Sequence, residues 1–166
     1  MKTAYFAGGC FWCITPDFQE TEGVAAVTAG YSGGLEENPT YLDVKLQKTH
    51  HRETVMVEYD ETVIGFPALV DIFLKGVDPF DEGGQFIDRG HSYTLAVYYL
   101  SEDEKQIASE KVRAVEKAAG KPAYISIESF RNFYTAEEEH QDYYRKHPEE
   151  FRRELIESGR LKETEA

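Results

Sequence analysis

The segment Cys10-Phe11-Trp12-Cys13 holds both cysteines of the chain and its only tryptophan. A thiol beside two large aromatic side chains can attack a substrate while those side chains hold an apolar group against it. A second thiol, three residues further along the chain, can form a disulfide with the first. The segment therefore indicates redox chemistry on a small, partly apolar substrate.

The residues before Cys10 predict how its thiol is presented. Lys2–Ala7 alternates as a buried strand does, and Gly8-Gly9 is typical of a turn that follows a strand. A helix that begins at about Cys10 would direct its unpaired N–H groups and the positive end of its dipole toward the thiol. Because cysteines at helix N-termini have lowered pKa values, we expect a stabilised thiolate at Cys10.

Other interpretations of the two cysteines stay open at this point. A thiol next to aromatic residues can be an inert part of the core. The C-x-x-C spacing of Cys10 and Cys13 also occurs in thioredoxin-like disulfide oxidoreductases and in metal-binding or interaction modules. The adjacent His50 and His51 have poor spacing for a tetrahedral zinc site with these cysteines. We therefore expect redox use of the pair, without a metal and without a cofactor.

Length and composition are those of a globular chain. A length of 166 residues favours one domain, and the net charge of −13 argues against nucleic acid or an anionic membrane surface as a partner. The sequence lacks a signal-peptide pattern and a membrane-spanning run, and two cysteines make no secreted disulfide framework. We expect a cytoplasmic monomer that forms a single domain over residues 1–166, with a core at about 3–151 and an acidic helical C-terminal tail.

Hydrophobic patterns predict an α+β fold, in which helices cover a mixed sheet. Strands are predicted at Lys2–Ala7, Val24–Tyr31, Thr54–Asp60, Tyr93–Leu100 and Tyr124–Ile127. Helices are predicted at Phe11–Glu20, Pro67–Lys75, Glu102–Ala119, Ala136–Lys146 and Pro148–Ser158. Two stretches without periodicity carry Tyr, His and Gly, which favours functional loops at Ser32–Thr49 and Val77–Gly90.

Short motifs between about Thr3 and about Phe151 occur in the order and at the spacings of one known family. They are Gly-Cys-Phe-Trp at 9–12, Ala29-Gly30-Tyr31-Ser32-Gly33-Gly34, Asn38-Pro39-Thr40-Tyr41, His51-Arg52-Glu53, Asp78-Pro79, Gly84-Gln85-Phe86, Asp88-Arg89-Gly90-His91-Ser92-Tyr93, Ala136-Glu137 and His140-Gln141-Asp142-Tyr143. Through these motifs the chain resembles the A-type peptide methionine sulfoxide reductases. One such motif would be weak evidence for the resemblance, but this many motifs in one order are specific to the family.

The resemblance implies a two-layer ferredoxin-like sandwich and the thiol-dependent reduction of methionine-S-sulfoxide, free or in proteins, to methionine. It assigns the attack on sulfur to Cys10, the proton for the oxygen to Glu53, and resolution of a Cys10 sulfenic acid to Cys13. Thioredoxin or a similar dithiol would then reduce the disulfide. The remaining implied site residues are Tyr41 and Tyr93, which would hydrogen-bond the sulfoxide oxygen, and Phe11, Trp12, Asp88 and Tyr143, which would bind substrate.

Elementary chemistry agrees with this assignment. A general acid must be protonated near neutral pH, and burial raises the pKa of a carboxyl group, so we expect Glu53 to be shielded from water. Without the resemblance, Glu53 would be interpreted as a solvated residue at the start of a strand. Glu137-Glu138-Glu139 would be interpreted as the solvated face of a helix.

Two departures from the family pattern indicate altered loop geometry and substrate preference. The stretch Lys45–His51 reads Lys-Leu-Gln-Lys-Thr-His-His, whereas the family usually has Cys, Gly and Thr-Gly-His there. Thr94 stands where an arginine often follows the tyrosine. Neither departure affects the residues to which the resemblance assigns chemistry.

Overall fold

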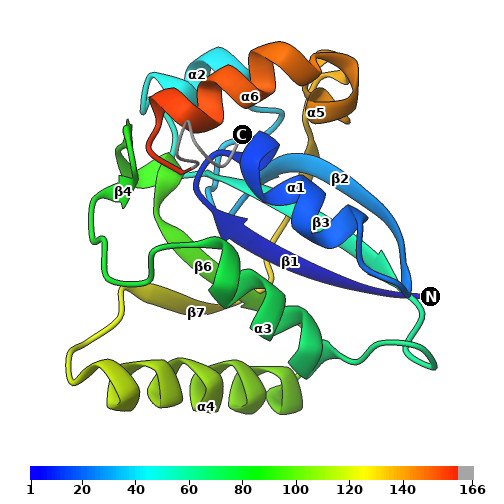
Figure 1. The fold of residues 1–166 in the computed structure, drawn as a ribbon, viewed down its shortest axis with the longest axis vertical. Coiled ribbons are helices and arrows are strands. Elements are labelled where there is room, and N and C mark those ends of the chain that lie inside the picture. Colours follow the sequence, from blue (N-terminus) through cyan, green and yellow to red (C-terminus); the bar gives the residue numbers. More distant parts are fainter. Residues whose placement is uncertain (161–166) are drawn as a thin grey trace.

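The computed structural model describes residues 1–160 and is an α+β fold built on a mixed six-stranded sheet (Figure 1). Strand β1 pairs antiparallel with β3 and β6, strand β2 pairs antiparallel with β3 and β8, and β6 pairs parallel with β7. The strands lie in the order β7 (Ile125–Ser129), β6 (Leu95–Tyr99), β1 (Lys2–Gly8), β3 (Arg52–Tyr59), β2 (Val24–Ser32) and β8 (Tyr134–Thr135).

Three helices cover one face of this sheet: α1 (Phe11–Gln19), α3 (Phe66–Gly76) and α4 (Glu102–Ala119). Phe6 of β1 stacks on Phe18 of α1 and on Phe73 of α3, with ring centroids 5.1 and 5.3 Å apart. All three rings are almost completely buried, and each contributes roughly 1.5–3 kcal/mol of burial free energy. This aromatic cluster fixes α1, and with it the cysteine segment, against the sheet.

The opposite face of the sheet carries a smaller apolar cluster. Tyr5 and Tyr98 point from β1 and β6 into this face, and the segment after β7 covers them. Phe130 of that segment stacks on Tyr5 with ring centroids 4.2 Å apart. Both faces of the sheet are therefore closed to water near its centre.

The remaining short elements gather at the end of the sheet where β1 runs into α1. Figure 1 shows α2, α5 and α6 together at that end. The elements are α2 (Tyr41–Lys45), the hairpin of β4 (Gly84–Gln85) and β5 (Asp88–Arg89), the 3₁₀ turns His91–Tyr93 and Glu138–His140, α5 (Tyr143–Lys146) and α6 (Pro148–Glu157). Most of the family motifs lie in this group or at the strand ends beside it.

The predicted class and most predicted elements are confirmed. Strands β1, β2, β3, β6 and β7 lie within two residues of their predicted bounds, and α4 has the predicted ones. Strand β3 begins earlier than predicted, so Glu53 lies inside it. Within residues 1–160, no helix is long and apolar enough to cross a membrane.

One predicted helix is wrong. Residues 136–146 contain a 3₁₀ turn and the four-residue α5 instead of a continuous helix, and β8 precedes them. The two predicted functional loops hold short elements, α2 in the first and the β4–β5 hairpin in the second. Of the predicted C-terminal tail, α6 is helical as far as Glu157, and residues 161–166 lie outside the described part of the chain.

Helix α4 is bounded by local signals. The Ser101 hydroxyl accepts a hydrogen bond from the Glu104 N–H at 3.2 Å, and the Glu104 carboxylate accepts one from the Leu100 N–H at 3.1 Å. Gly120 ends the helix with φ of 70°, a conformation that favours glycine. These three residues explain why the helix could be predicted without tertiary information.

Replacing the cap should destabilise the protein without affecting the other end of the sheet. We expect Ser101→Ala to lower the free energy of unfolding by about 1 kcal/mol, because it leaves the Glu104 N–H without its side-chain acceptor. Urea unfolding at pH 7 measures this change. Ser109→Ala, inside the same helix, is the matched control and should leave stability equal or slightly raised. Equal effects of the two substitutions would contradict the capping role.

Candidate active site

The turn between β1 and α1 presents both thiols at the start of a helix. Gly9 has φ of 84°, and a Cβ atom there would lie 2.8 Å from the Gln85 side chain, so only glycine fits. Cys10 is the N-cap of α1, as predicted, and its carbonyl accepts a hydrogen bond from the Cys13 N–H at 3.0 Å. Both cysteines are reduced and partly buried, in the first turn of the helix.

The predicted ionisation of Cys10 is wrong for the protein without substrate. A hydrogen bond with the Cys13 thiol and burial raise the pKa of Cys10, and the negative charge of Glu53 adds to the effect when that group is ionised. The same hydrogen bond lowers the pKa of Cys13, against the effect of burial, and the Arg160 guanidinium lowers it further. The helix N-terminus is in place, and the shared hydrogen bond and burial oppose its effect on Cys10.

Glu53 is a buried carboxyl group directly behind the start of α1. Its side chain comes from β3 and is 1% exposed. Its Oε1 atom accepts a hydrogen bond from the Phe11 N–H at 3.1 Å, whereas Oε2 has no hydrogen-bond partner among the described residues. Burial raises the pKa of Glu53 to about 8, despite the opposing effect of the Phe11 hydrogen bond. The group is therefore protonated at neutral pH and has one free oxygen.

A cavity of about 270 Å³ opens in front of the thiols. Tyr41 from α2 and Tyr93 from the 3₁₀ turn before β6 form part of its wall. Burial and the neighbouring Glu53 raise the pKa of both tyrosines, so both hydroxyls stay protonated and can donate hydrogen bonds. The lining residues are Cys10, Trp12, Cys13, Tyr41, Lys45, Ile87, Asp88, Tyr93, Glu154, Glu157 and Ser158.

Trp12 provides the apolar side of this cavity. Its ring stacks on Tyr143 of α5 with centroids 4.0 Å apart and planes 13° apart. Its Nε1–H donates a hydrogen bond to His140 Nδ1 at 3.2 Å. Phe11 does not line the cavity, contrary to its predicted contact with substrate, because it is fully buried and packs against Tyr31. Phe11 supports the site from behind through its ring and its backbone N–H.

Asp88 and Arg160 bring opposite charges to the same region. Burial raises the pKa of Asp88, and the positive charges of Arg160 and Lys45 partly oppose this. The Arg160 guanidinium lies over the Phe86 ring, 4.5 Å from its centroid, and donates a hydrogen bond to the Gly76 carbonyl at 3.4 Å. The segment after α6 thus places a cation near Cys13.

Three side chains of the segment after β8 complete the site. The sequence analysis predicted no role in the site for any of them. Glu137 is exposed, as predicted, but it precedes a 3₁₀ turn and accepts hydrogen bonds from the Tyr31 hydroxyl at 2.8 Å and the Tyr41 N–H at 3.0 Å. Gln141 pairs through its side-chain amide with the N–H and carbonyl of Ala29. His140 packs 4.1 Å from the Tyr41 ring centroid. In the sequence, only their positions in the family motifs indicated that these residues belong to the site. The partners described here lie far from them in the sequence.

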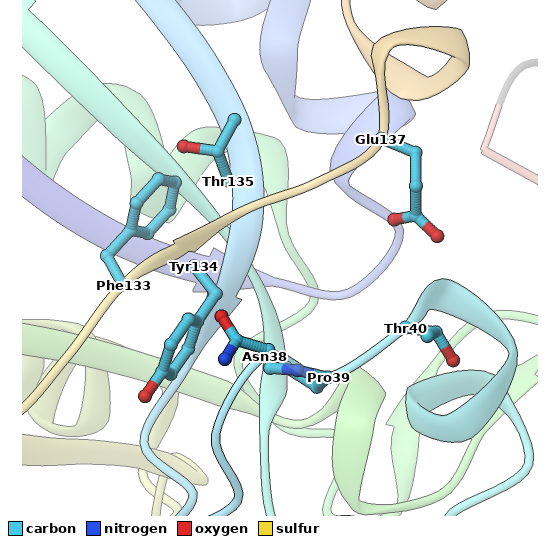
Figure 2. Close-up of a pocket in the computed structure, with 7 residues that line it drawn as sticks. All are labelled: Asn38, Pro39, Thr40, Phe133, Tyr134, Thr135 and Glu137. Carbon is cyan, nitrogen blue, oxygen red and sulfur yellow. The ribbon is translucent and has the colours of Figure 1, made fainter.

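A second cavity, of about 390 Å³, lies beside Glu137. Figure 2 shows Asn38, Pro39 and Thr40 on one side of it and Phe133, Tyr134 and Thr135 on the other. This cavity is larger than the first, but no thiol, histidine or cation lines it. The chemistry suggested by the cysteines therefore belongs to the smaller cavity.

Both departures from the family pattern have structural partners. In the stretch Lys45–His51, the His50 N–H donates a hydrogen bond to Glu36 Oε1 at 3.1 Å, and His50 Nδ1 lies 3.0 Å from Glu36 Oε2. The Thr94 hydroxyl accepts a hydrogen bond from Arg52 Nε at 2.8 Å. Within residues 1–160, no three His, Cys, Asp or Glu side chains are arranged to hold a metal ion.

Comparisons with known proteins point to one family. The family model described as peptide methionine sulfoxide reductase matches residues 2–166. The peptide methionine sulfoxide reductase MsrA of Bacillus velezensis is 42% identical over 161 residues, which cover 96% of this chain and 91% of that protein. Methionine sulfoxide reductase A of Corynebacterium diphtheriae superposes with a TM-score of 0.81 at 31% identity, over 89% of this chain and 75% of that one. Mxr1 of Saccharomyces cerevisiae in reduced form superposes with a TM-score of 0.84 at 28% identity, over 89% of this chain and 86% of that one.

The buried carboxyl group should make stability depend on pH in a defined direction. The pKa of Glu53 is about 8 in the folded protein and 4.5 ordinarily, so the unfolded chain releases this proton first as pH rises. Glu53 therefore lowers the free energy of unfolding progressively as the pH rises from 4.5 to 8. The full penalty in stability remains above pH 8. At about 1.4 kcal/mol for each pKa unit, this penalty is on the order of a few kcal/mol.

We expect Glu53→Gln to gain stability relative to the unsubstituted protein as the pH increases from 4.5 to 8. The glutamine has no proton to lose, and its carbonyl can still accept the Phe11 hydrogen bond. Urea unfolding of both proteins at several pH values gives the difference. Glu58→Gln, on the same strand, is the control and should show a constant difference. A constant difference for Glu53→Gln as well would show that Glu53 is ionised in the folded protein at neutral pH.

Proposed function

Because this chain belongs to the peptide methionine sulfoxide reductase family and is an oxidoreductase, we propose that it reduces methionine-S-sulfoxide with Cys10 as nucleophile and Cys13 as resolving thiol. The S epimer is part of the proposal, since each epimer of methionine sulfoxide has its own class of reductase. The substrate would be methionine sulfoxide, free or in an oxidised protein, which makes repair of oxidised proteins the expected role.

The proposal depends most on Glu53. A carboxyl group that stays protonated at neutral pH, with one oxygen free, is what a general acid for a leaving oxygen requires. Its other oxygen is fixed by the Phe11 N–H, one residue after the nucleophile.

In the first proposed step, Cys10 Sγ attacks the sulfoxide sulfur, and the proton of its thiol passes to the Glu53 carboxylate that forms when Glu53 protonates the oxygen. Glu53 supplies a proton to the sulfoxide oxygen, which transfers to Cys10 as a sulfenic acid while methionine leaves. The Tyr41 and Tyr93 hydroxyls, protonated beside the cavity, would hydrogen-bond the oxygen as its charge develops. The Trp12 face, stacked on Tyr143, would hold the methyl group.

In the second step, Cys13 Sγ attacks the sulfenic sulfur, a disulfide forms and the oxygen leaves as water. Methionine sulfoxide and two thiols thus become methionine, a disulfide and water. The lowered pKa of Cys13 supports this role, because the thiolate is the attacking form of a thiol. Thioredoxin or a similar dithiol would then reduce the disulfide.

The finer structural predictions also belong to this proposal. The β6-β1-β3-β2 order, with α1 after β1 and α3 after β3, supports a ferredoxin-like βαββαβ core, which β7 and β8 extend at the two edges. Asp88, half-buried at the cavity wall, would order the surrounding loops. We further propose one domain over residues 1–166, acting as a cytoplasmic monomer without metal or cofactor.

Removing the acid should slow chemistry more than binding. We expect Glu53→Gln to reduce the single-turnover rate of methionine formation by about 10²–10⁴-fold, because the neutral amide cannot give up a proton. Rapid-quench measurement with excess enzyme and methionine-S-sulfoxide gives this rate. Glu58→Gln, on the same strand, should react normally. If Glu53→Gln also keeps its rate, the proton comes from another group and the assignment fails.

Removing the resolving thiol should stop the cycle after one turnover. We expect Cys13→Ser to form one equivalent of methionine and then remain as Cys10 sulfenic acid when thioredoxin is the only reductant. Small thiols can attack the sulfenic acid directly and should partly restore turnover. Mass spectrometry after one turnover should show a Cys10–Cys13 disulfide only in the unsubstituted protein. Full thioredoxin-driven turnover of Cys13→Ser would refute the role of Cys13.

A further inference from the structure

Lys45 is a cation in the wall of the thiol cavity to which the mechanism assigns no role. It is the last residue of α2, and its Nζ lies 5.7 Å from the centroid of the Tyr41 ring. Among residues 1–160, no carboxylate lies within ion-pair distance of its ammonium group, whereas Lys2, Lys111 and Lys146 each have such a partner. Lys45 also begins the stretch in which this chain departs from the family pattern.

Other walls of the same cavity are anionic. Glu154 and Glu157 line it from α6, and Asp88 lines it from β5. The Glu154 carboxylate is already engaged, because it accepts a hydrogen bond from the Tyr143 hydroxyl at 3.2 Å. An anionic group that entered the cavity would be repelled by these carboxylates and attracted by Lys45, which is the only lysine or arginine among the residues that line it. The other cation nearby, Arg160, acts on Cys13 and Asp88 without lining the cavity.

Lys45 lines the same cavity as the thiol that the mechanism makes the nucleophile. In methionine sulfoxide, two methylene groups separate the sulfur from the α-carbon, so the carboxylate lies a few bonds from the atom that Cys10 attacks. The ammonium group of Lys45 is near enough to Glu53 and Asp88 for its charge to lower the pKa of both. It therefore lies within electrostatic range of the reacting groups as well as of a carboxylate attached to the substrate.

We propose that Lys45 is a specificity-determining residue that binds a carboxylate carried by the substrate next to the sulfoxide. In the free amino acid this group is the α-carboxylate, and in a protein it is the side chain of a neighbouring aspartate or glutamate. The inference rests on the proposed function, because it requires methionine sulfoxide to occupy this cavity. A cation at a partly open site acts mainly on binding, so the expected effect is on KM rather than on kcat.

The test compares substrates that differ only in charge. N-acetyl-methionine-S-sulfoxide carries a carboxylate, and its amide carries none. We expect Lys45→Gln to lower the ratio of kcat/KM for the acid to kcat/KM for the amide by about threefold to tenfold, chiefly through KM. Lys45→Arg should keep most of the ratio. Lys48→Gln removes an exposed lysine that does not line the cavity, and this control should keep the ratio of the unsubstituted protein.

Two further measurements separate the sources of the carboxylate and the cause of any loss. Peptides with aspartate or asparagine after the oxidised methionine show whether a side-chain carboxylate is bound in the same way. Added salt should reduce the preference for the acid in the unsubstituted protein and not in Lys45→Gln, because salt screens exposed charges. An unchanged ratio in Lys45→Gln, or equal losses on acid and amide, would overturn the role of Lys45. Failure of the unsubstituted protein to reduce either compound would instead overturn the proposed function.

Discussion

The organisation of the site follows from keeping one carboxyl group away from water. Glu53 lies on β3 between β1 and β2, where the sheet alone would leave its end open. Phe11 donates its backbone N–H to this carboxyl group, Tyr31 packs at a tilt against the Phe11 ring, and Tyr41 stacks on the same ring. These rings come from three separate elements, α1, β2 and α2. The raised pKa of Glu53 is therefore a property of the assembled fold. Loss of any of these packing contacts would admit water and return the pKa toward its ordinary value.

The two thiols show the same dependence on surroundings. Cys10 and Cys13 share one helical turn, yet their pKa values move in opposite directions. The hydrogen bond between the two thiols raises the pKa of Cys10 and lowers that of Cys13. Burial raises both pKa values, and Arg160, from the far end of the described chain, lowers that of Cys13. Helix position alone predicts a lowered pKa for Cys10.

Sequence reasoning succeeded where the cause was local and failed where it was not. Helix α4 could be predicted to its ends because Ser101, Glu104 and Gly120 act on their own neighbours. The helix predicted at 136–146 does not form, because Glu137 and Gln141 bond to Tyr31, Tyr41 and Ala29, more than ninety residues earlier. Hydrophobic periodicity contains no information about such partners. The family motifs located the site residues, but the burial of Phe11 and the pKa of Cys10 required the assembled structure.

The cavity wall formed by α6 has a consequence for biosynthesis. Cys10 is synthesised well before Glu154, Glu157 and Ser158, which line the same cavity. The two edges of strand β1 can pair only after β3 and β6 have been synthesised. During translation the nascent chain thus carries its thiols without their enclosing wall and without the Arg160 charge. The redox centre is completed only when synthesis has passed residue 160, so shorter chains carry exposed thiols without the cavity wall formed by α6.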